Sequence, residues 1–506
     1  MSDQKPPART GPSWDETLED LAQRRAAARA MGGSERLEKR KAPGRLNARE
    51  RVDELLDPGS FHEFGTLVGG DVPADGIVAG SGTINGRPVM VGSEDFTTLA
   101  GTIGGGSNAK RYRAAELALR DRMPFVMLLE GAGARTGGHG GRSPTDLIVQ
   151  SQCSGRVPVV SAVMGASAGH GALIVPMSDF SVMTADAAVF TAGPPVVKES
   201  LGEEISKQDL GGPRVAIPSG LIHNVAPDDP SALQLIRDYL SYFPSSAWSY
   251  PPSRGARDGD DQGPRPTDEL LDIVPRDSRK VYDMRRVIDV IVDNGDWSEV
   301  QPGFGGAVIC GLAHLGGEPI AIVANQPRVL AGSIDANAAD KAAHFIMVAD
   351  SFHLPLVFLA DNPGVLPGSA SERAAILRSG ARMFAAQTQA TTVKLHLLLR
   401  KAYGFGSMVM SMISFDRQSA TFAYPGATLG VMGAGAMSRA KGADSDEAAE
   451  LRAAELGASY RSASTLGVDE LIDPRETRDA LLHALQRALW RRQAAPEPVS
   501  RTAITP

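Results

Sequence analysis

Short apolar runs along the chain alternate with segments that have the apolar spacing of helices. The runs 125–129 and 356–360 each follow a proline and contain no charged residue. Uninterrupted runs of this length are typical of strands buried on both faces of a parallel sheet. Residues 342–349 instead place apolar side chains at i, i+3, i+4 and i+7, as a helix packed on a sheet does. The pattern predicts an α/β protein with mostly parallel sheets covered by helices.

The chain contains an internal repeat. The segment 99–103 (LAGTI) returns in the second half as 330–334 (LAGSI), and the two apolar runs are related by the same offset in numbering. Each run ends on an acidic residue, Glu130 in the first copy and Asp361 in the second. A repeat that preserves the order of strands and helices indicates a tandem pair of α/β domains.

Each copy continues into a strand and a glycine turn. The apolar segments 157–164 and 393–399 lead into the turns 169–171 (Gly-His-Gly) and 404–406 (Gly-Phe-Gly). The offset between the turns exceeds the offset between the earlier segments, and four inserted residues account for the change. A glycine turn between a parallel strand and a helix is a frequent ligand site, because unpaired backbone N–H groups converge there.

A polar stretch separates the two copies. Residues 253–268 are rich in Gly, Pro, Arg and Asp and contain almost nothing to bury, as expected of a linker between domains. A chain of 506 residues also exceeds what one hydrophobic core usually supports. We therefore predict an N-terminal domain over 1–257 and a C-terminal domain over 258–506. Before the first copy, we predict a helix over 14–31 and a solvated basic arm over 36–41.

The composition is that of a globular protein and argues against several classes. The formal charge is -7 and no basic stripe with interleaved aromatics occurs, which argues against a nucleic-acid partner. Cys153 and Cys310 are too few for a disulfide framework or a zinc ribbon. The N-terminus lacks an apolar signal stretch, and the apolar run 157–177 is interrupted by Pro, Ser, His and Gly. We expect a cytoplasmic protein that does not contact a membrane.

A search for catalytic motifs leaves only the two turns. The chain has no GxxxxGK[ST] phosphate loop, no HExxH and no GxSxG, and its histidines and carboxylates lack metal-ligand spacing, so we expect no metal. A Gly-x-Gly turn lets successive N–H groups face one ligand oxygen and stabilise an enolate or another oxyanion. Each turn alone would equally fit a structural bend, but the duplication favours two oxyanion holes.

Short motifs are spread over nearly the whole chain. They include 47–52 (NARERV), 55–61 (LLDPGSF), 75–78 (DGIV), 130–135 (EGAGAR), 324–327 (ANQP), 363–368 (PGVLPG), 400–404 (RKAYG), 431–434 (VMGA) and 473–478 (DPRETR). Together these motifs resemble the carboxyltransferase (beta) subunits of biotin-dependent acyl-CoA carboxylases, such as the propionyl-CoA and methylcrotonyl-CoA carboxylases.

The resemblance implies a fold and a reaction. The fold would be a tandem pair of crotonase-like (ClpP/crotonase) α/β domains, commonly assembled as a hexamer with sites between the N-domain of one chain and the C-domain of another. The enzyme would transfer a carboxyl group from carboxybiotin to the α or vinylogous carbon of an acyl-CoA. One hole would hold the thioester enolate and the other the biotin ureido oxygen, while the biotin nitrogen takes the α-proton without a side-chain base.

The resemblance also implies the site residues. The first turn would face the thioester carbonyl and the second turn the biotin oxygen. The expected catalytic residues are Gly169, His170, Gly171, Gly404, Phe405 and Gly406, and the expected cofactor-binding residues are Lys110, Arg135, Ala168, Tyr403 and Met408.

Several of these assignments keep an alternative. Lys110, Arg135 and also Arg36 are candidates for CoA phosphates, but on charge alone a solvated surface, or a structural ion pair for Arg135, fits equally. Met408 stands where the family tunes the choice of acyl chain. The chain shows neither an ATP-grasp region nor a biotinylated Met-Lys-Met, so a biotin carboxylase and a biotin carboxyl carrier would be separate partners.

Both turns depart from the family pattern. The family usually has Gly-Gly where this chain has Gly169-His170, and Gly-Gly-Ala where it has Gly404-Phe405-Gly406. A side chain leaves the N–H in place if φ stays in a region open to non-glycine residues. The rings would reshape the pockets, so the acyl group stays open. His170 is then either a pocket-shaping residue or an added acid or hydrogen-bond donor.

Two other functions fit the same residues. A biotin-dependent acyl-CoA decarboxylase uses the family's fold in the reverse direction. A catalytically silent scaffold subunit of a carboxylase complex is the second alternative, because both turns carry a bulky residue.

Overall fold

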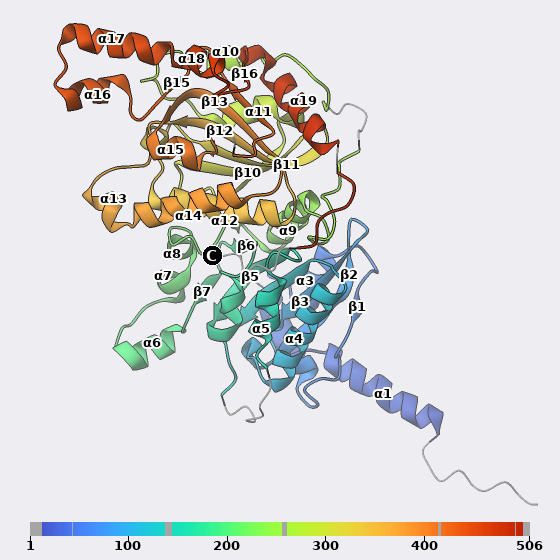
Figure 1. Ribbon diagram of the computed structural model, residues 1–506. Coiled ribbons are helices and arrows are strands. Elements are labelled where there is room, and N and C mark those ends of the chain that lie inside the picture. The colour runs from blue at the N-terminus through green and yellow to red at the C-terminus, as the bar shows by residue number, and fades with distance from the viewer. Residues whose placement is uncertain are drawn as a thin grey trace, which may run out of the picture.

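The structure consists of two similar halves, each built on one β-sheet. The computed structural model describes residues 13–42, 44–136, 144–255, 261–412, 416–490 and 492–498. In Figure 1 the N-terminal half, blue to green, lies below the C-terminal half, yellow to red. The helices α12 (Ala336–Ser351) and α14 (Ile376–Gln389) lie between the two sheets.

The first sheet has eight strands in the order β1-β2-β3-β4-β5-β6-β8, with β7 paired to β5. β2 and β3 are antiparallel, whereas β3, β4, β5 and β6 are parallel neighbours. The elements of this half are α1 (Trp14–Arg29), α2 (Ser34–Lys41), α3 (Ala48–Leu55), β1 (His62–Glu63), η1 (Pro73–Gly76), β2 (Ile77–Ile84), β3 (Arg87–Glu94), η2 (Leu99–Gly101), α4 (Gly105–Arg120), β4 (Phe125–Gly131), α5 (Asp146–Cys153), β5 (Val159–Ala168), η3 (Gly169–Ile174), β6 (Phe180–Thr184), β7 (Ala188–Phe190), α6 (Pro194–Leu201), α7 (Lys207–Gly211), α8 (Pro213–Ala216), β8 (Asn224–Ala226) and α9 (Asp229–Tyr242).

The second sheet has the same number of strands, in the order β16-β14-β13-β12-β11-β10-β9, with β15 paired to β13. β10 and β11 are antiparallel, and β11, β12, β13 and β14 are parallel neighbours. Besides α12 and α14, the elements of this half are α10 (Leu270–Ile273), α11 (Met284–Ile291), η4 (Asp293–Gly295), β9 (Trp297–Val300), β10 (Val308–Leu315), β11 (Glu318–Asn325), η5 (Leu330–Gly332), β12 (Leu356–Asn362), α13 (Ser369–Arg373), β13 (Lys394–Tyr403), α15 (Gly404–Val409), β14 (Ala420–Ala423), β15 (Thr428–Gly430), α16 (Ala434–Lys441), α17 (Ser445–Leu456), α18 (Ala458–Ser464), β16 (Glu470–Leu471), η6 (Pro474–Glu476) and α19 (Thr477–Leu489).

The tandem duplication is confirmed element by element. The pairs β2 and β10, β3 and β11, α4 and α12, and β4 and β12 begin and end at the offset that relates the two Leu-Ala-Gly segments, and β5 and β13 are related by the larger offset of the turns. The two apolar runs are the central strands β4 and β12, and every residue of both strands is buried. Burial on both faces explains why these strands lack the alternating polar positions of an open sheet.

The two halves share one apolar core. Residues of β4 and β5 belong to the same buried cluster as residues of α12 and β10. Phe243, just after α9, packs edge-on against Phe352 at a ring distance of 5.7 Å, and the His353 ring bonds to the carbonyl of Ala247 at 2.8 Å. The chain crosses between the halves over 243–269, and residues 256–260, where the predicted domain boundary falls, lie outside the described residues.

The N-terminal arm begins with the predicted helix. α1 extends over Trp14–Arg29, against a prediction of 14–31, and Ser13 and Glu16 form its capping box. Trp14 is 75% exposed, and Figure 1 shows α1 standing away from the body of the molecule. Among the helices that the structure describes, none is long and apolar enough to cross a membrane.

A buried ionic cluster ties the arm to the first sheet. Arg51 on α3 is fully buried; it pairs with Glu130 at 2.9 Å and with Asp229 at 3.0 Å, and donates to the carbonyl of Met164 at 2.6 Å. Arg40 on α2 reaches the same Glu130 at 2.5 Å. Glu130 is the penultimate residue of β4 and Asp229 is the first residue of α9, so the cluster joins α2 and α3 to two elements that are distant from them in sequence.

Arg51→Ala removes one cation of this buried cluster and leaves Asp229 without its partner. We expect the free energy of unfolding to fall by about 3–5 kcal/mol, the usual cost of breaking a buried ion pair. Arg113→Ala is the matched control, because Arg113 pairs with Glu116 on the exposed face of α4, where such a loss costs less than about 1 kcal/mol. Urea denaturation followed by circular dichroism measures both, and equal midpoints for the two variants would contradict the prediction.

Candidate active site

In each sheet, one long parallel strand ends in a glycine turn. β5 stops at Ala168 and a helical turn begins at Gly169, while β13 stops at Tyr403 and α15 begins at Gly404. Gly169 and Gly404 have φ angles of 55° and 54°, a left-handed conformation that residues with a Cβ seldom adopt. The two turns, which the sequence singled out, therefore follow the same backbone course at equivalent places.

Neighbouring loops approach each other closely at the same sheet edge. A Cβ on Gly101 would lie 2.4 Å from the carbonyl oxygen of Glu130, and a Cβ on Gly332 would lie 2.4 Å from the carbonyl oxygen of Asp361. Both distances are far below van der Waals contact. Glycine is thus required at equivalent positions of the two halves, because backbone from the next strand occupies the place of the side chain.

The repeated Leu-Ala-Gly segment is itself strained. Leu99 and Ala100 have φ angles of 47° and 54°, and Leu330 and Ala331 have φ angles of 50° and 54°. Non-glycine residues in this region cost energy and persist mainly at functional sites. In the sequence, this segment served only as evidence of the internal repeat. The identity of the two copies was the signal that could have marked it as part of the site.

In the first turn, the ring of His170 is held by α5. His170 Nε2 forms a short hydrogen bond with Asp146, the buried first residue of α5. The other oxygen of Asp146 accepts Arg111 Nε at 2.6 Å, and Arg111 in turn donates to Glu94 at 2.5 Å. Burial opposes ionisation of Asp146, but the hydrogen bonds from His170 and Arg111 outweigh it and lower the pKa of Asp146 to about 2.

Sequence reasoning missed the three residues of the ionic chain that begins at His170. Glu94, Arg111 and Asp146 belong to β3, α4 and α5, and no spacing in the sequence relates them. Glu94 also accepts the N–H of Glu130 at 2.8 Å, so the ionic chain extends from the turn to the end of β4.

In the second turn, the Phe405 ring packs on apolar surface. It lies 5.9 Å from the ring of Phe384 on α14. A Cβ on Gly380 of the same helix would lie 2.9 Å from the Phe405 ring. Behind this turn, a Cβ on Gly406 would lie only 2.4 Å from Asn362 Oδ1, so the backbone is again tightly packed.

Lys110 lies inside the first half. Its Nζ donates to the carbonyl oxygens of Ala74, at 3.3 Å, and Ile77. Lys341 is its counterpart in the second copy and donates to the carbonyl oxygen of Phe304 at 2.7 Å. Burial lowers the pKa of Lys110 to about 8. Both lysines thus hold loop backbone in place, and the predicted role of Lys110 in binding CoA stays a prediction.

Arg135 forms a structural ion pair, which is one of the roles that its charge allowed. Its Nη1 contacts Asp75 at 2.6 Å, and its Nη2 donates to the carbonyl of Thr102 at 2.8 Å. The guanidinium therefore joins the end of the glycine-rich segment 130–135 to the loop before β2. Binding of CoA by Arg135 remains untested.

Three further predicted residues flank the turns. Ala168 and Tyr403 are the last residues of β5 and β13. The Tyr403 hydroxyl donates to Thr428 at 2.8 Å and also bonds to Glu455 on α17. Met408, on α15, is 45% exposed, so its side chain is accessible beside the second turn.

A basic cavity lies beside the strained Leu99-Ala100 segment of the first half. It measures about 730 Å³, and four cations face two carboxylates in its wall. Arg36 donates to the carbonyl of Thr97 at 3.0 Å, and Lys39 extends into solvent. The lining residues are Arg36, Lys39, Arg40, Arg45, Phe96, Thr97, Leu99, Ala100, Glu130 and Asp186.

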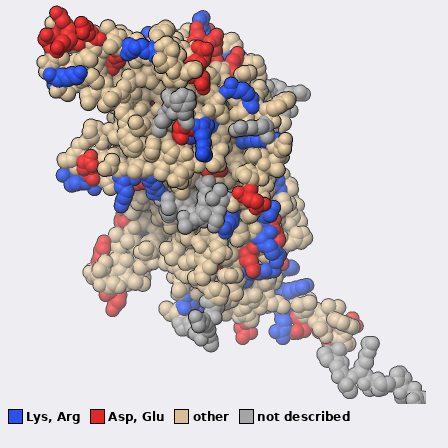
Figure 2. Space-filling view, viewed as in Figure 1, with Lys and Arg blue, Asp and Glu red and all other residues tan. Residues whose placement is uncertain are grey.

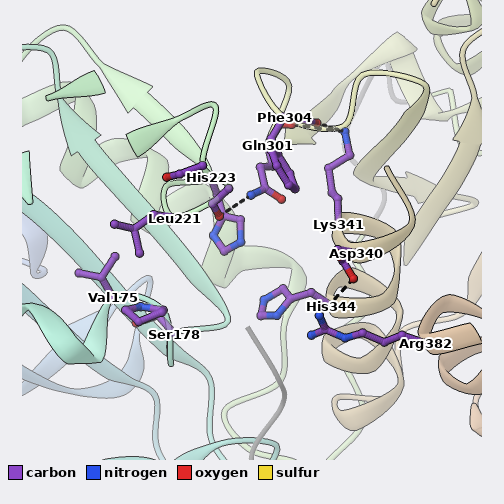
Figure 3. Close-up of a pocket in the computed structure, with 13 residues that line it drawn as sticks. Val175, Ser178, Leu221, His223, Gln301, Phe304, Asp340, Lys341, His344 and Arg382 are labelled. Atoms are coloured by element: carbon purple, nitrogen blue, oxygen red, sulfur yellow. Dashed lines mark hydrogen bonds and ion pairs between the residues drawn. The ribbon is translucent and has the colours of Figure 1, made fainter. Parts of the chain in front are cut away.

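A second cavity, of about 310 Å³, lies between the halves, and no residue of 169–171 or 404–406 lines it. Figure 3 shows His223 from the first half facing His344 of α12, with the Asp340–Arg382 pair beside them. The two imidazole rings are 5.3 Å apart, and Arg382 Nη1 contacts Asp340 at 3.3 Å. None of the predicted site residues lines this cavity.

The chain is similar to carboxyl-transferring enzymes over most of its length. Residues 39–502 match the family model of the carboxyl transferase domain. The chain is 37% identical to the methylmalonyl-CoA carboxyltransferase 12S subunit of Propionibacterium freudenreichii (95% of each chain), 34% to the methylmalonyl-CoA decarboxylase alpha subunit of Veillonella parvula (94% and 97%), and 35% to the mitochondrial propionyl-CoA carboxylase beta chain of Sus scrofa (94% and 93%).

The fold is that of a solved member of the family. A crystal structure of transcarboxylase 12S, a hexamer with hydrolysed methylmalonyl-CoA bound, superimposes with a TM-score of 0.88 at 36% identity, covering 97% of this chain and 99% of that one. Its match confirms the tandem crotonase-like architecture. The protein is therefore an enzyme that belongs to the carboxyl transferase family.

Proposed function

We propose that the protein transfers a carboxyl group from carboxybiotin, on a partner carrier, to the α or vinylogous carbon of an acyl-CoA. The observation that carries the proposal is the pair of glycine turns. Each follows a buried parallel strand, begins with a left-handed glycine and presents consecutive backbone N–H groups at the sheet edge. Two such turns match a reaction that develops negative charge on two different oxygens.

The turns act through their backbone. In the first half, the N–H groups of 169–171 donate to the thioester oxygen as the enolate forms, and in the second half those of 404–406 donate to the biotin ureido oxygen. Biotin supplies the carboxyl group and, by family resemblance, the nitrogen that accepts the α-proton. The packing of Gly406 against Asn362 and of Gly171 against Glu94 keeps these donors in place before substrate arrives, so little reorganisation is needed.

CoA fits the basic cavity of the first half. Its phosphates carry several negative charges, and the wall offers four cations beside the exposed side chains of Phe96 and Leu99. The cavity also borders Ala100, whose carbonyl accepts the N–H of Ala132; the next residue, Gly133, packs against the backbone of Ala168 and Gly169 at the first turn. A CoA bound here would lead its thioester toward the turn. Arg36 and Lys39 are the phosphate ligands that we favour. Arg40 and Arg45 pair with the buried Glu130, whereas Lys39 pairs only with the exposed Glu35, at 2.7 Å, a contact that costs little to exchange for a phosphate.

The active enzyme is proposed to be an oligomer, with a biotin carboxylase and carrier as partners. Large apolar side chains are exposed near both turns: Val196 and Leu201 on α6, and Val431 and Met432 before α16. Figure 2 shows acidic side chains gathered at the end of α17, which projects from the body at the upper left. Exposed apolar side chains of this kind suit association with further copies. The hexamer of transcarboxylase 12S supports the same number here.

The main alternative is the reverse reaction, in which the protein acts as a biotin-dependent acyl-CoA decarboxylase subunit. The decarboxylase subunit of Veillonella parvula is nearly as similar as the carboxyltransferase and carboxylase relatives. The test is reconstitution with a biotinylated carboxylase subunit, ATP, bicarbonate and a panel of short, branched and long acyl-CoAs. Carboxylation of one panel member supports the proposal. Biotin-dependent decarboxylation alone would favour the alternative, and no activity in either direction would favour a scaffold subunit.

Gly169→Ala and Gly404→Ala form a matched pair that separates the two turns. Both changes put a Cβ on a residue with φ near 55°, so both impose a similar strain of about 1–2 kcal/mol. We expect Gly169→Ala to lower kcat/KM for the acyl-CoA by at least about tenfold, and Gly404→Ala to lower it for the carboxylated carrier, since misplacing an oxyanion donor costs up to about 10³ in rate. Steady-state kinetics with each substrate varied in turn measures this; equal losses toward both substrates in both variants would contradict separate holes.

The CoA assignment predicts a salt-dependent defect. Replacing Arg36 and Lys39 by Ala should weaken binding of free CoA about fivefold to tenfold at low ionic strength, and less at high salt, because exposed charges are screened. Isothermal titration calorimetry at two salt concentrations measures the effect. Replacing Arg113 and Arg120 by Ala, both on the exposed surface of α4, is the control that removes the same net charge. A salt-independent loss would argue against contact with the phosphates.

Lys110→Met provides a further contrast. Since Lys110 bonds to loop carbonyls, we expect this variant to be less stable, with an affinity for free CoA that changes by the same factor at low and high salt. A loss confined to low salt, like that of the Arg36 and Lys39 variant, would instead support the predicted phosphate contact.

A further inference from the structure

The second residue of each turn is bulky, and its side chain is packed against a helix. His170 bonds to Asp146, the first residue of α5. Phe405 packs on α14, next to Gly380. The two helices occupy similar places, because α5 packs on α4 and α14 packs on its counterpart α12. Each half therefore has its own means of holding the ring that follows the first glycine of the turn.

The first half holds its ring with buried charge. Asp146 and Arg111 are fully buried, and Glu94 nearly so. Besides His170 and Arg111, Asp146 accepts Gln150 Nε2 at 2.8 Å, which fixes the carboxylate on α5. The charged groups near the turn are thus Asp146 from α5, Glu94 from β3 and Arg111 from α4.

The second half has no ionisable residue at the corresponding positions. At the offset of the repeat, the counterparts of Glu94 and Arg111 are Asn325 and Ala342, and the turn carries Phe405 in place of His170. The contact on the helix is Gly380, whose missing side chain leaves room for the Phe405 ring. The duplication thus preserved the backbone of the turn and replaced an ionic attachment by an apolar one.

We propose that Asp146 is a positioning residue for the acyl-CoA half of the reaction, which keeps the His170 ring clear of the first turn, and that Gly380 does the same for Phe405 in the carboxybiotin half. The proposal rests on the proposed function of the two turns. Neither residue needs to touch a substrate, since each acts through the ring that it accommodates.

The physical reason is that an unattached ring has other staggered χ1 positions. The N–H groups of the turn lie within one residue of the ring, so a rotated imidazole competes with the thioester for the same space. The hydrogen bond to Asp146 removes that freedom, and the buried Arg111 keeps Asp146 from turning away. In the second half, a Cβ on Gly380 would stand 2.9 Å from the Phe405 ring and force it to move.

The first test is rescue by removing the ring. We expect Asp146→Asn to lower kcat/KM for the acyl-CoA about tenfold, with little change for the carboxylated carrier. The pH dependence of kcat/KM for the acyl-CoA should also change. In the double variant Asp146→Asn, His170→Gly, kcat/KM should return to that of His170→Gly alone, because no ring remains to be positioned. The assay uses the full chain with its carboxylase partner, and thermal unfolding reports on folding.

The second test is the matched variant in the other half. Gly380→Ala should lower kcat/KM for the carboxylated carrier only, and Phe405→Gly should restore it. Alanine favours the helix more than glycine does, so loss of α14 is not expected. If Asp146→Asn fails to fold, the Gly380→Ala and Phe405→Gly variants test the positioning role by themselves.

The outcomes separate the inference from the proposed function. If the wild-type protein transfers carboxyl groups but Asp146→Asn and Gly380→Ala are unaffected, the positioning role is wrong and the proposed function stands. Losses toward both substrates, or losses that ring removal does not rescue, would also overturn the positioning role, since they indicate a general effect on the fold. An inactive wild-type protein would overturn both.

Discussion

Close approach of backbone at the carboxyl edge of each sheet is the constraint on which the rest of the site depends. Gly101 and Gly332 sit against the carbonyls of the next strand with no space for a Cβ, and the turns at Gly169 and Gly404 need a left-handed φ. Because backbone groups are placed by the sheet itself, the donors are rigid before any ligand binds. Rigid, preoriented N–H groups are what stabilisation of an oxyanion requires.

Duplication supplied this backbone twice, and the side chains around it have since diverged. The first half has Glu94, Arg111 and Asp146 beside its turn, whereas in the second half the repeat counterparts of Glu94 and Arg111 are the uncharged Asn325 and Ala342. The halves nevertheless share one core through α12, so their turns are held in a fixed relation within the chain. The same backbone fold can therefore serve two chemically different substrates, because the environment of each turn is set by side chains that the backbone does not constrain.

Much of the fold could be predicted from local pattern. The apolar runs became β4 and β12, the helix predicted over 14–31 is α1, and the repeat offset matches the element bounds. Such features depend on residues close in sequence. The partners of single side chains could not be predicted: the ammonium of Lys110, a candidate for CoA phosphates, bonds to loop carbonyls, and Arg135 pairs with Asp75 across the sheet edge. Charge alone does not reveal burial.

The sequence by itself determined the family, the tandem α/β architecture and the two glycine turns, because each of these is written in contiguous residues or in a fixed offset. Only the tertiary structure decided what surrounds the turns. Asp146 meets His170, and Gly380 makes room for Phe405, through packing of helices on a sheet that no spacing in the chain encodes. Side chains from separate elements meet only after the sheet has formed, and that is why their chemistry was not visible before.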